Sequence, residues 1–317
     1  MQSWEWGDFK SRHGWSPERV SVDGAGGHAY AQVLFRAKGP VSIGYLPRGP
    51  VLGGDGQAIW PEFRALLDET ARRHRAISVI VEPDGPVGLT GSFRNAGFVQ
   101  GPSHVQPQRT VKVPLLDDET MLKQMHQKTR YSVRLAQRRG VTVARAALDA
   151  ASYDAFYRLL EDTAKRNEFA IHSRAYYEDF MAQFGSRAVM LMAMVEDNLA
   201  AALIAAAFGD EAIYMYGASS TQHRAHGAAF LLQFEAMRWA RECGCARYDL
   251  WGIPDVDPAS IVGEGGSVAG TKGDDWRGLF RFKSGFGGDV VRYPPTMERR
   301  YHPVLTWLAR RSDVLNG

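Results

Sequence analysis

The chain contains two segments with the same layout, and this repetition constrains its fold more than any other feature. Each segment has a strand, a helix and a second strand, at 41–45, 59–74 and 77–81 in the first and at 212–216, 227–243 and 247–250 in the second. A strand followed by a helix and another strand is the unit from which parallel sheets are built. The layout therefore predicts two related α/β domains.

Composition and charge are those of an ordinary globular protein. The 317 residues suffice for two domains, the hydrophobic share is 45% and the charged share is 23%. A net charge of +3 does not indicate a nucleic-acid binder. Cys243 and Cys245 fit neither a disulfide framework nor the usual zinc spacing. The longest apolar stretch, Leu199–Phe208, is too short to cross a bilayer. We therefore expect a cytoplasmic protein whose contact with a membrane is at most peripheral.

A helix is predicted over 118–139, between the two layouts. Asp117 is placed to cap its start, and Gly140 is placed to end it. We expect the domain boundary just after this helix, which gives domains at 1–148 and 149–294.

Basic residues recur along the same helix. Arg130, Arg134 and Arg138 are four residues apart and therefore share one helix face, with Lys123 nearby. Arginine forks suit phosphate groups, so the stripe could hold an RNA backbone or a diphosphate. A solvated helix face explains it equally well. We expect Arg130 and Tyr131 to be partly buried.

Two tyrosines and a glycine-rich segment are further candidates for ligand contact. Tyr214 and Tyr216 are two residues apart on a predicted strand, so we expect both on one face, in a binding site or in the core. The segment Gly263–Gly278 contains six glycines. It could fold over a ligand as a lid or be an ordinary exposed loop.

Five segments resemble, in the right order, the motifs of the Fem family (FemABX type). They are Trp6–Lys10, Tyr45–Pro50, Lys128–Val141, Tyr214–Ser219 and Phe280–Gly288. Enzymes of that family move an amino acid from aminoacyl-tRNA onto a peptidoglycan precursor. The resemblance implies an α/β (α+β) fold of two tandem GNAT-like (acyl-CoA N-acyltransferase) domains, with mixed sheets flanked by helices. It also implies that the C-terminal segment 295–317 returns to the first domain. The chain has no heptad-rich insertion, as in the short FemX-like type.

The resemblance assigns the donor side of the reaction to the end of the chain. Lys283 would be catalytic and would stabilise the oxyanion of the tetrahedral intermediate. Phe282 and Arg281 would contact the aminoacyl end of the tRNA. Arg130 and Arg134 would add contacts to the tRNA backbone.

Residues of the other motifs would hold the acceptor. Lys10 would contact the diphosphate of the precursor. Tyr214 and Tyr216 would bind the stem peptide and sugar, and Arg48 is a further substrate-binding candidate. Glu82 ends a strand, where α/β clefts open, and would guide or accept the proton of the attacking amine. A loop-capping glutamate is the alternative.

The chain departs from the family pattern over 169–177. Family members of the FemX type hold the soluble precursor with an arginine and a tyrosine four residues apart. Here either His172 with Tyr176 or Arg174 with Tyr177 fills these places. The acceptor is therefore either UDP-MurNAc-pentapeptide or lipid II.

Two other functions remain open. The segment Arg224–Ala229 fits the R-x-x-G-x-A loop of coenzyme A-dependent acetyltransferases, in which a helix N-terminus binds a diphosphate. A non-catalytic RNA-binding module is the third alternative. The histidines show no metal-ligand spacing, and no nucleophile elbow occurs. We expect a monomeric enzyme with no metal, no cofactor other than the aminoacyl-tRNA donor, no covalent intermediate and no DNA partner.

Overall fold

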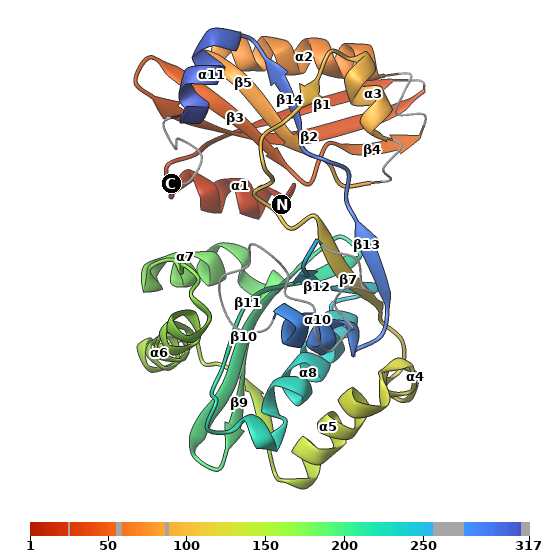
Figure 1. The fold of residues 1–317 in the computed structure, drawn as a ribbon, viewed down its shortest axis with the longest axis vertical. Helices are drawn as coiled ribbons and strands as arrows, with labels where there is room; N and C mark the ends of the chain where they lie inside the picture. Colours follow the sequence, from red (N-terminus) through yellow and green to blue (C-terminus); the bar gives the residue numbers. More distant parts are fainter. Residues whose placement is uncertain (25, 55–58, 86–88, 256–275, 312–317) are drawn as a thin grey trace. The chain divides into compact units, whose positions relative to one another are not determined.

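The protein consists of two compact units, each with its own sheet and hydrophobic core. A computed structural model describes residues 1–24, 26–54, 59–85, 89–255 and 276–311. The first unit contains Met1–Gln108 and Arg292–Gly317, and the second contains Arg109–Val291. Both sheets are mixed and flanked by helices, as predicted (Figure 1). Most of the glycine-rich segment, for which a lid and an exposed loop were the alternatives, lies outside the described residues.

The sheet of the first unit has the strand order β1-β2-β3-β5-β14-β6, and β4 pairs with β2. Its strands are β1 (Ser16–Gly24), β2 (Gly27–Lys38), β3 (Val41–Pro47), β4 (Val51–Gly54), β5 (Ala76–Glu82), β6 (Val99–Gln100) and β14 (Met297–Arg300). Its helices are α1 (Trp4–Ser11), α2 (Trp60–Arg73), α3 (Leu89–Asn95) and α11 (Pro303–Arg311). Strands β3 and β5 are parallel, and α2 connects them, which is the first predicted layout.

Helix α2 covers one face of this sheet. Its buried positions Phe63, Leu67 and Ala71 recur at helical spacing and pack against Val33 and Val79 of the sheet. Burying a side chain the size of Phe63 or Leu67 stabilises the fold by about 1.5–3 kcal/mol. Figure 1 shows α1 on the opposite side of the sheet.

The sheet of the second unit has the order β13-β7-β12-β11-β10-β9-β8. Its strands are β7 (Arg109–Pro114), β8 (Thr142–Arg145), β9 (Ala188–Val195), β10 (Asn198–Phe208), β11 (Glu211–Ser219), β12 (Arg247–Gly252) and β13 (Asp289–Arg292). Its helices are α4 (Asp118–Gln124), α5 (Gln127–Arg138), α6 (Ala150–Asn167), α7 (Arg174–Phe184), α8 (Ala228–Glu242) and α10 (Trp276–Ser284), with short turns η1 (Gly185–Arg187) and η2 (Arg224–His226). Figure 1 shows α6 and α7 on one side of the sheet and α8 on the other.

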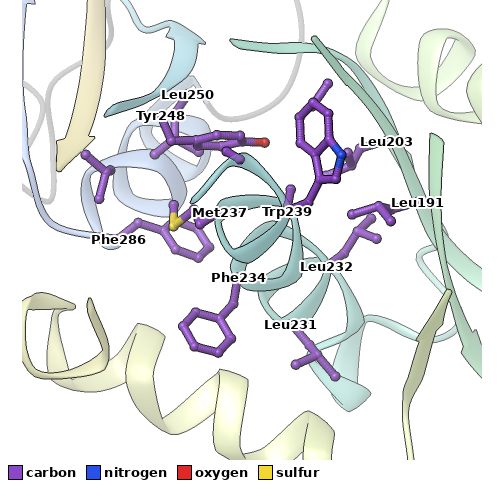
Figure 2. Close-up of a cluster of buried hydrophobic side chains, with 14 of the residues drawn as sticks. Leu191, Leu203, Leu231, Leu232, Phe234, Met237, Trp239, Tyr248, Leu250 and Phe286 are labelled. Atoms are coloured by element: carbon purple, nitrogen blue, oxygen red, sulfur yellow. The ribbon is translucent and has the colours of Figure 1, made fainter. Parts of the chain in front are cut away.

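Helix α8 supplies more buried side chains to the core of the second unit than any other described helix does. Figure 2 shows Leu231, Leu232 and Phe234 of α8 in the same cluster as Leu191 and Leu203 of the sheet. None of the described helices has the length and apolar content that crossing a bilayer requires.

The division between the units lies earlier than the predicted boundary at residue 148. Strand β7 pairs antiparallel with β12, and Val133 of α5 belongs to the core of the second unit. Residues 109–148 are therefore part of the second unit. At the other end of the chain, β14 pairs with β5, with Met297 opposite Val81. This segment completes the first sheet.

The helix predicted over 118–139 is in fact two helices, α4 and α5. The backbone of Met125 is extended, with ψ of 145°, and this interrupts the helical hydrogen bonds. The capping predictions are confirmed. Asp117 accepts a hydrogen bond from the Thr120 amide at 3.0 Å, and Gly140 follows α5 with a φ of 71°.

Candidate functional site

The parallel strands β11 and β12 separate partway along their length. Their paired residues are Glu211↔Arg247, Ala212↔Tyr248 and Ile213↔Asp249. Strand β11 nevertheless continues to Ser219, and β12 continues to Gly252. Ligands of α/β proteins commonly bind beyond the carboxyl ends of such strands. The separated ends are therefore the place where reactive side chains are expected.

Lys283 lies at the separated ends, in the last turn of α10. It is only 5% exposed. Its Nζ donates a hydrogen bond to the Gly252 carbonyl at 2.8 Å and lies 5.6 Å from the centre of the Tyr214 ring. Burial lowers the pKa of Lys283 to about 8, and the negative charge of Asp249 limits this fall. The ammonium is a desolvated positive charge, whose interactions are stronger than those of a lysine in water.

Asp249 is a buried carboxylate that is absent from the sequence-based predictions. It is 1% exposed, and its Oδ1 accepts hydrogen bonds from the Thr110 hydroxyl and, at 2.7 Å, from the Trp251 amide. Trp251 has a φ of 62°, a left-handed conformation that costs about 1–3 kcal/mol outside glycine. The bond to Asp249 stabilises the turn that presents the Gly252 carbonyl to Lys283. The sequence signal that could have identified Asp249 is a single acidic residue within an otherwise apolar strand.

A β-bulge separates Tyr214 from Tyr216. Tyr214 is opposite Ala205 of β10 and Tyr216 is opposite Ile204, so Met215 is an extra residue. Ala205 and Ile204 point to opposite faces of the sheet, and their partners do the same. The prediction that both tyrosines share one face is therefore wrong, because one inserted residue inverts the alternation.

Tyr214 and Tyr216 have different surroundings as a result. Tyr214 packs against the core that contains α8, and burial raises its pKa to about 12. Tyr216 packs instead against Tyr177 and Phe180 of α7, at ring-centroid distances of 5.0 and 5.6 Å. Burial raises the pKa of Tyr216 well above its ordinary value. Of the two tyrosines, only Tyr214 lies beside Lys283.

His172 belongs to the aromatic cluster on α7. Its ring is stacked on Tyr176 at 3.8 Å, and its amide donates to the Tyr177 hydroxyl at 3.2 Å. Tyr176 and Tyr177 are buried, whereas His172 is exposed. Burial raises the pKa of Tyr177 to about 12. Of these side chains, that of His172 is the most accessible to a ligand.

Arg174, the alternative to His172, is held by carboxylates. Its Nε lies 3.0 Å from Oδ1 of Asp154 on α6, and its Nη2 lies 2.9 Å from Oε1 of Glu178. These two ion pairs neutralise the guanidinium and join α7 to α6.

Phe282 and Arg281 precede Lys283 on α10 but differ in exposure. Phe282 is half-buried and makes edge contacts with Phe230 and Phe286 at 5.0 and 5.3 Å. Arg281 is exposed. The phenylalanine thus anchors α10 in the core of the second unit, and the arginine is available to an anionic ligand.

The basic stripe of α5 divides into structural and exposed members. The Nη1 of Arg130 donates to the carbonyls of Lys123 and Leu122 at 3.1 and 3.4 Å, which closes the C-terminal end of α4. Arg134 is exposed. Tyr131 is 56% exposed, so the prediction of its partial burial is wrong. It sits on the outer face of α5, away from the core positions of this helix.

The R-x-x-G-x-A segment forms the start of α8 and contacts α5. Gly227 has a φ of 74°, and a Cβ at this position would meet the Ser132 carbonyl oxygen of α5 at 2.8 Å. Arg139 donates a hydrogen bond to the Ala225 carbonyl in the same turn. The glycine is therefore explained by helix packing, without a bound diphosphate.

Glu82 lies in the first unit and is 2% exposed. One oxygen accepts hydrogen bonds from the Tyr45 hydroxyl at 2.6 Å and the Gln106 amide at 3.0 Å. The other oxygen accepts a bond from the Val105 amide. These bonds are what the loop-capping alternative predicts.

Lys10 and Arg48 also belong to the first unit. Burial, followed by the charge of Arg36, lowers the pKa of Lys10 to about 8. Its Nζ lies 5.5 Å from the centre of the Trp6 ring. Arg48 is buried, donates to the Pro107 carbonyl at 2.6 Å, and lies 3.4 Å from the centre of the Tyr293 ring. Arg48 therefore holds together two segments of the first unit that are far apart in sequence.

The described residues offer no group of three His, Cys, Asp or Glu side chains that could hold a metal ion. Cys243 is exposed and Cys245 is buried, and neither forms a disulfide.

Comparisons with known proteins agree with one another. The sequence profile of the FemAB family matches residues 91–198 and 196–311. A lipid II:glycine glycyltransferase of Staphylococcus aureus is 25% identical over 374 residues, covering 90% of this chain and 84% of that protein. The crystal structure of FemX has a TM-score of 0.79 at 22% identity, covering 97% of this chain and 93% of that one. A tandem GNAT protein from the clavulanic acid pathway has a TM-score of 0.50 at 13% identity, covering 89% and 83%. The two structures establish the tandem GNAT-like fold.

Proposed function

Because this chain belongs to the FemAB family, we propose that it transfers an amino acid onto a peptidoglycan precursor. Relatives named lipid II:glycine glycyltransferase support this type of reaction. The acceptor is the stem-peptide amine, and the product is an amide that starts an interpeptide bridge or branch. The donor, in this proposal, is aminoacyl-tRNA.

The buried ammonium of Lys283 is the observation that carries the proposal. Attack of an amine on an ester carbonyl develops negative charge on the carbonyl oxygen. A cation already held in a site with little water stabilises this charge without reorganising. Lys283 is buried, fixed by the Gly252 carbonyl and close to Asp249. We assign it the stabilisation of the oxyanion.

The proposed step forms one bond and breaks one. The amine nitrogen attacks the ester carbonyl, and the C–O bond to the 3′ ribose of the tRNA breaks. The proton lost by the amine ends on the ribose oxygen that leaves. The step needs no redox partner and no covalent intermediate on the protein.

Glu82 has a structural role within the first unit and does not remove this proton, in our proposal. Its two oxygens already accept three hydrogen bonds, from Tyr45, Val105 and Gln106. A carboxylate in this state is a weak candidate for a base, because protonating it would disrupt the bonds it accepts.

The acceptor side is assigned to Lys10 and His172. Lys10 supplies a positive charge for the diphosphate, and His172 with Tyr176 replaces the arginine–tyrosine pair of the family pattern. Arg174 is less suited to an anion, because Asp154 and Glu178 already neutralise it. On the donor side, the exposed Arg134 and Arg281 suit the RNA backbone.

The test supplies a pool of charged tRNA together with UDP-MurNAc-pentapeptide or lipid II. Mass spectrometry then detects any added aminoacyl mass. The wild type is compared with Lys283→Ala and with Lys165→Ala, a matched change at an exposed lysine on α6. Transfer by the wild type and by Lys165→Ala, with loss in Lys283→Ala, is the expected result. No transfer to either acceptor from fully charged tRNA would reject the proposal and make acetyl-CoA binding the next measurement.

A further inference from the structure

Helix α11 presents large apolar side chains to solvent. Val304 is 71% exposed, Leu305 41%, Trp307 52% and Leu308 49%. At about 100° per residue these four side chains fall within an arc of about 160° on one side of the helix. Thr306, which is 4% exposed, lies opposite the middle of this arc. The polar residue faces the protein, and the apolar arc faces outward.

Hydrogen bonds, and not burial of the apolar arc, fix this orientation. The Ile77 carbonyl of β5 accepts bonds from the Tyr301 and His302 amides at 2.9 and 3.1 Å. It also accepts a bond from the Thr306 hydroxyl at 3.2 Å. The start of α11 is thereby attached to β5. In an ordinary surface helix such as α2 the apolar stripe faces the sheet, so the pattern of α11 is reversed.

We propose that the outer face of α11 docks on the surface of a lipid bilayer. The helix has nine residues and is about 13.5 Å long. Such a face is too small for the roughly 800 Å² that each partner buries in a stable protein interface. An interfacial helix needs only an apolar side that enters the headgroup boundary.

The residues of the helix suit this boundary. The indole of Trp307 combines an apolar ring with a polar N–H, and tryptophan is enriched at membrane–water interfaces. We therefore choose a bilayer over a second copy of the chain.

This inference deepens the proposed function, because a lipid-linked acceptor has to be met at a membrane. Docking by α11 would raise the concentration of the enzyme where such an acceptor lies. Binding to lipid is nevertheless measurable without any turnover, so the two proposals can fail separately.

The test sediments the full chain with vesicles of phosphatidylglycerol and phosphatidylethanolamine. The altered protein is Trp307→Ser/Leu308→Ser, and the control is Phe208→Ser, which changes an apolar residue that is 41% exposed in the second unit. We expect the double variant to bind at least about tenfold less, since it loses apolar area at the interface. The control should bind as the wild type does.

A second measurement keeps the test valid if the double variant folds poorly. Lipids brominated near the headgroup should quench part of the tryptophan fluorescence of the wild type, and this part should be missing in Trp307→Phe. Equal binding by all proteins, or no binding by the wild type, would overturn the proposal. A wild-type dimer that dissociates in the double variant without any lipid binding would assign the face to a second copy instead.

Turnover then separates docking from catalysis. The double variant should keep its rate on UDP-MurNAc-pentapeptide and lose rate on lipid II in vesicles. A wild type that binds vesicles and transfers to neither acceptor would contradict the proposed function and leave the docking face standing.

Discussion

The same strand–helix–strand layout is closed in the first unit and open in the second. The parallel strands of the first unit, β3 and β5, remain paired from Ser42↔Ala76 to Pro47↔Glu82. Those of the second unit, β11 and β12, stop pairing after Ile213↔Asp249. The strand that ends in Glu82 therefore keeps its parallel neighbour to its last residue. The strand that holds Asp249 loses its parallel neighbour there and continues to Gly252 paired only with the antiparallel β7.

The two carboxylates show what the difference achieves. Glu82 bonds to Tyr45 on the neighbouring strand, so it helps to close the sheet. Asp249 bonds to the Trp251 amide and places its charge near Lys283. The same layout thus has a structural role at the strand ends of the first unit and a candidate reactive role at those of the second. The separation of β11 from β12 distinguishes the two.

The largest effect should come from removing the cation at the open end. Lys283→Ala should lower the transfer rate by about 10²–10³, the usual loss for one oxyanion-stabilising group. Single-turnover kinetics with saturating acceptor would measure the chemical step. Retention of more than a tenth of the rate, in a variant that melts as the wild type does, would remove Lys283 from the mechanism.

The buried ammonium of Lys283 should also lower the free energy of unfolding of the protein. The native pKa of Lys283 is about 8 and that of an unfolded lysine is 10.5, so the unfolded state binds more protons between these values. The penalty of burying the ammonium is complete below pH 8 and is relieved as the pH rises towards 10.5. Lys283→Met should therefore raise the free energy of unfolding at pH 7 by about 2–3 kcal/mol. Urea titrations at pH 7 and pH 10 should show this gain shrinking at the higher pH. An equal gain at both would show that another cause is at work.

The closed end should respond in the opposite sense. Glu82→Gln puts an amide where two backbone N–H groups and a hydroxyl donate, so it should destabilise the protein by about 1–3 kcal/mol. The rate per folded molecule should stay within about threefold of the wild type. Urea unfolding and kcat should be measured on the same preparation. A fall in kcat of a hundredfold with unchanged stability would make Glu82 the base.

The smallest effect should be a shift in pH dependence at the open end. Asp249 raises the pKa of Lys283, so Asp249→Asn should lower it further below 8. Loss of kcat/KM on the alkaline side should then begin about one pH unit lower. Thr110→Val is the matched control, because it removes a hydrogen bond to Asp249 and keeps the charge. An unchanged profile in Asp249→Asn would mean that the charge of Asp249 does not act on catalysis.

The helices and strands of both layouts could be predicted because their signals are local. Apolar runs identify β3, β5, β11 and β12, and caps such as Asp117 and Gly140 mark helix ends. The chain also carries the family motifs, which led to the tandem fold. Each of these signals lies within a few residues of the element that it describes.

The features that create the site could not be predicted in this way. The bulge at Met215 becomes visible only when Tyr214 is seen opposite Ala205. The unit boundary depends on the pairing of β7 with β12, more than a hundred residues later. The burial of Lys283 depends on Gly252, across a segment outside the described residues. Such long-range contacts leave no local periodicity in the sequence.

Strand β14 lies between β5 and β6, in the interior of the first sheet. A nascent chain leaves the ribosome N-terminus first, so the whole of Arg109–Val291 emerges before this strand does. All strands of the second unit have thus been translated while β6 still lacks its pairing partner β14. The unit that begins at the N-terminus is completed last, and translation of Met297–Arg300 sets the earliest moment at which its sheet can close.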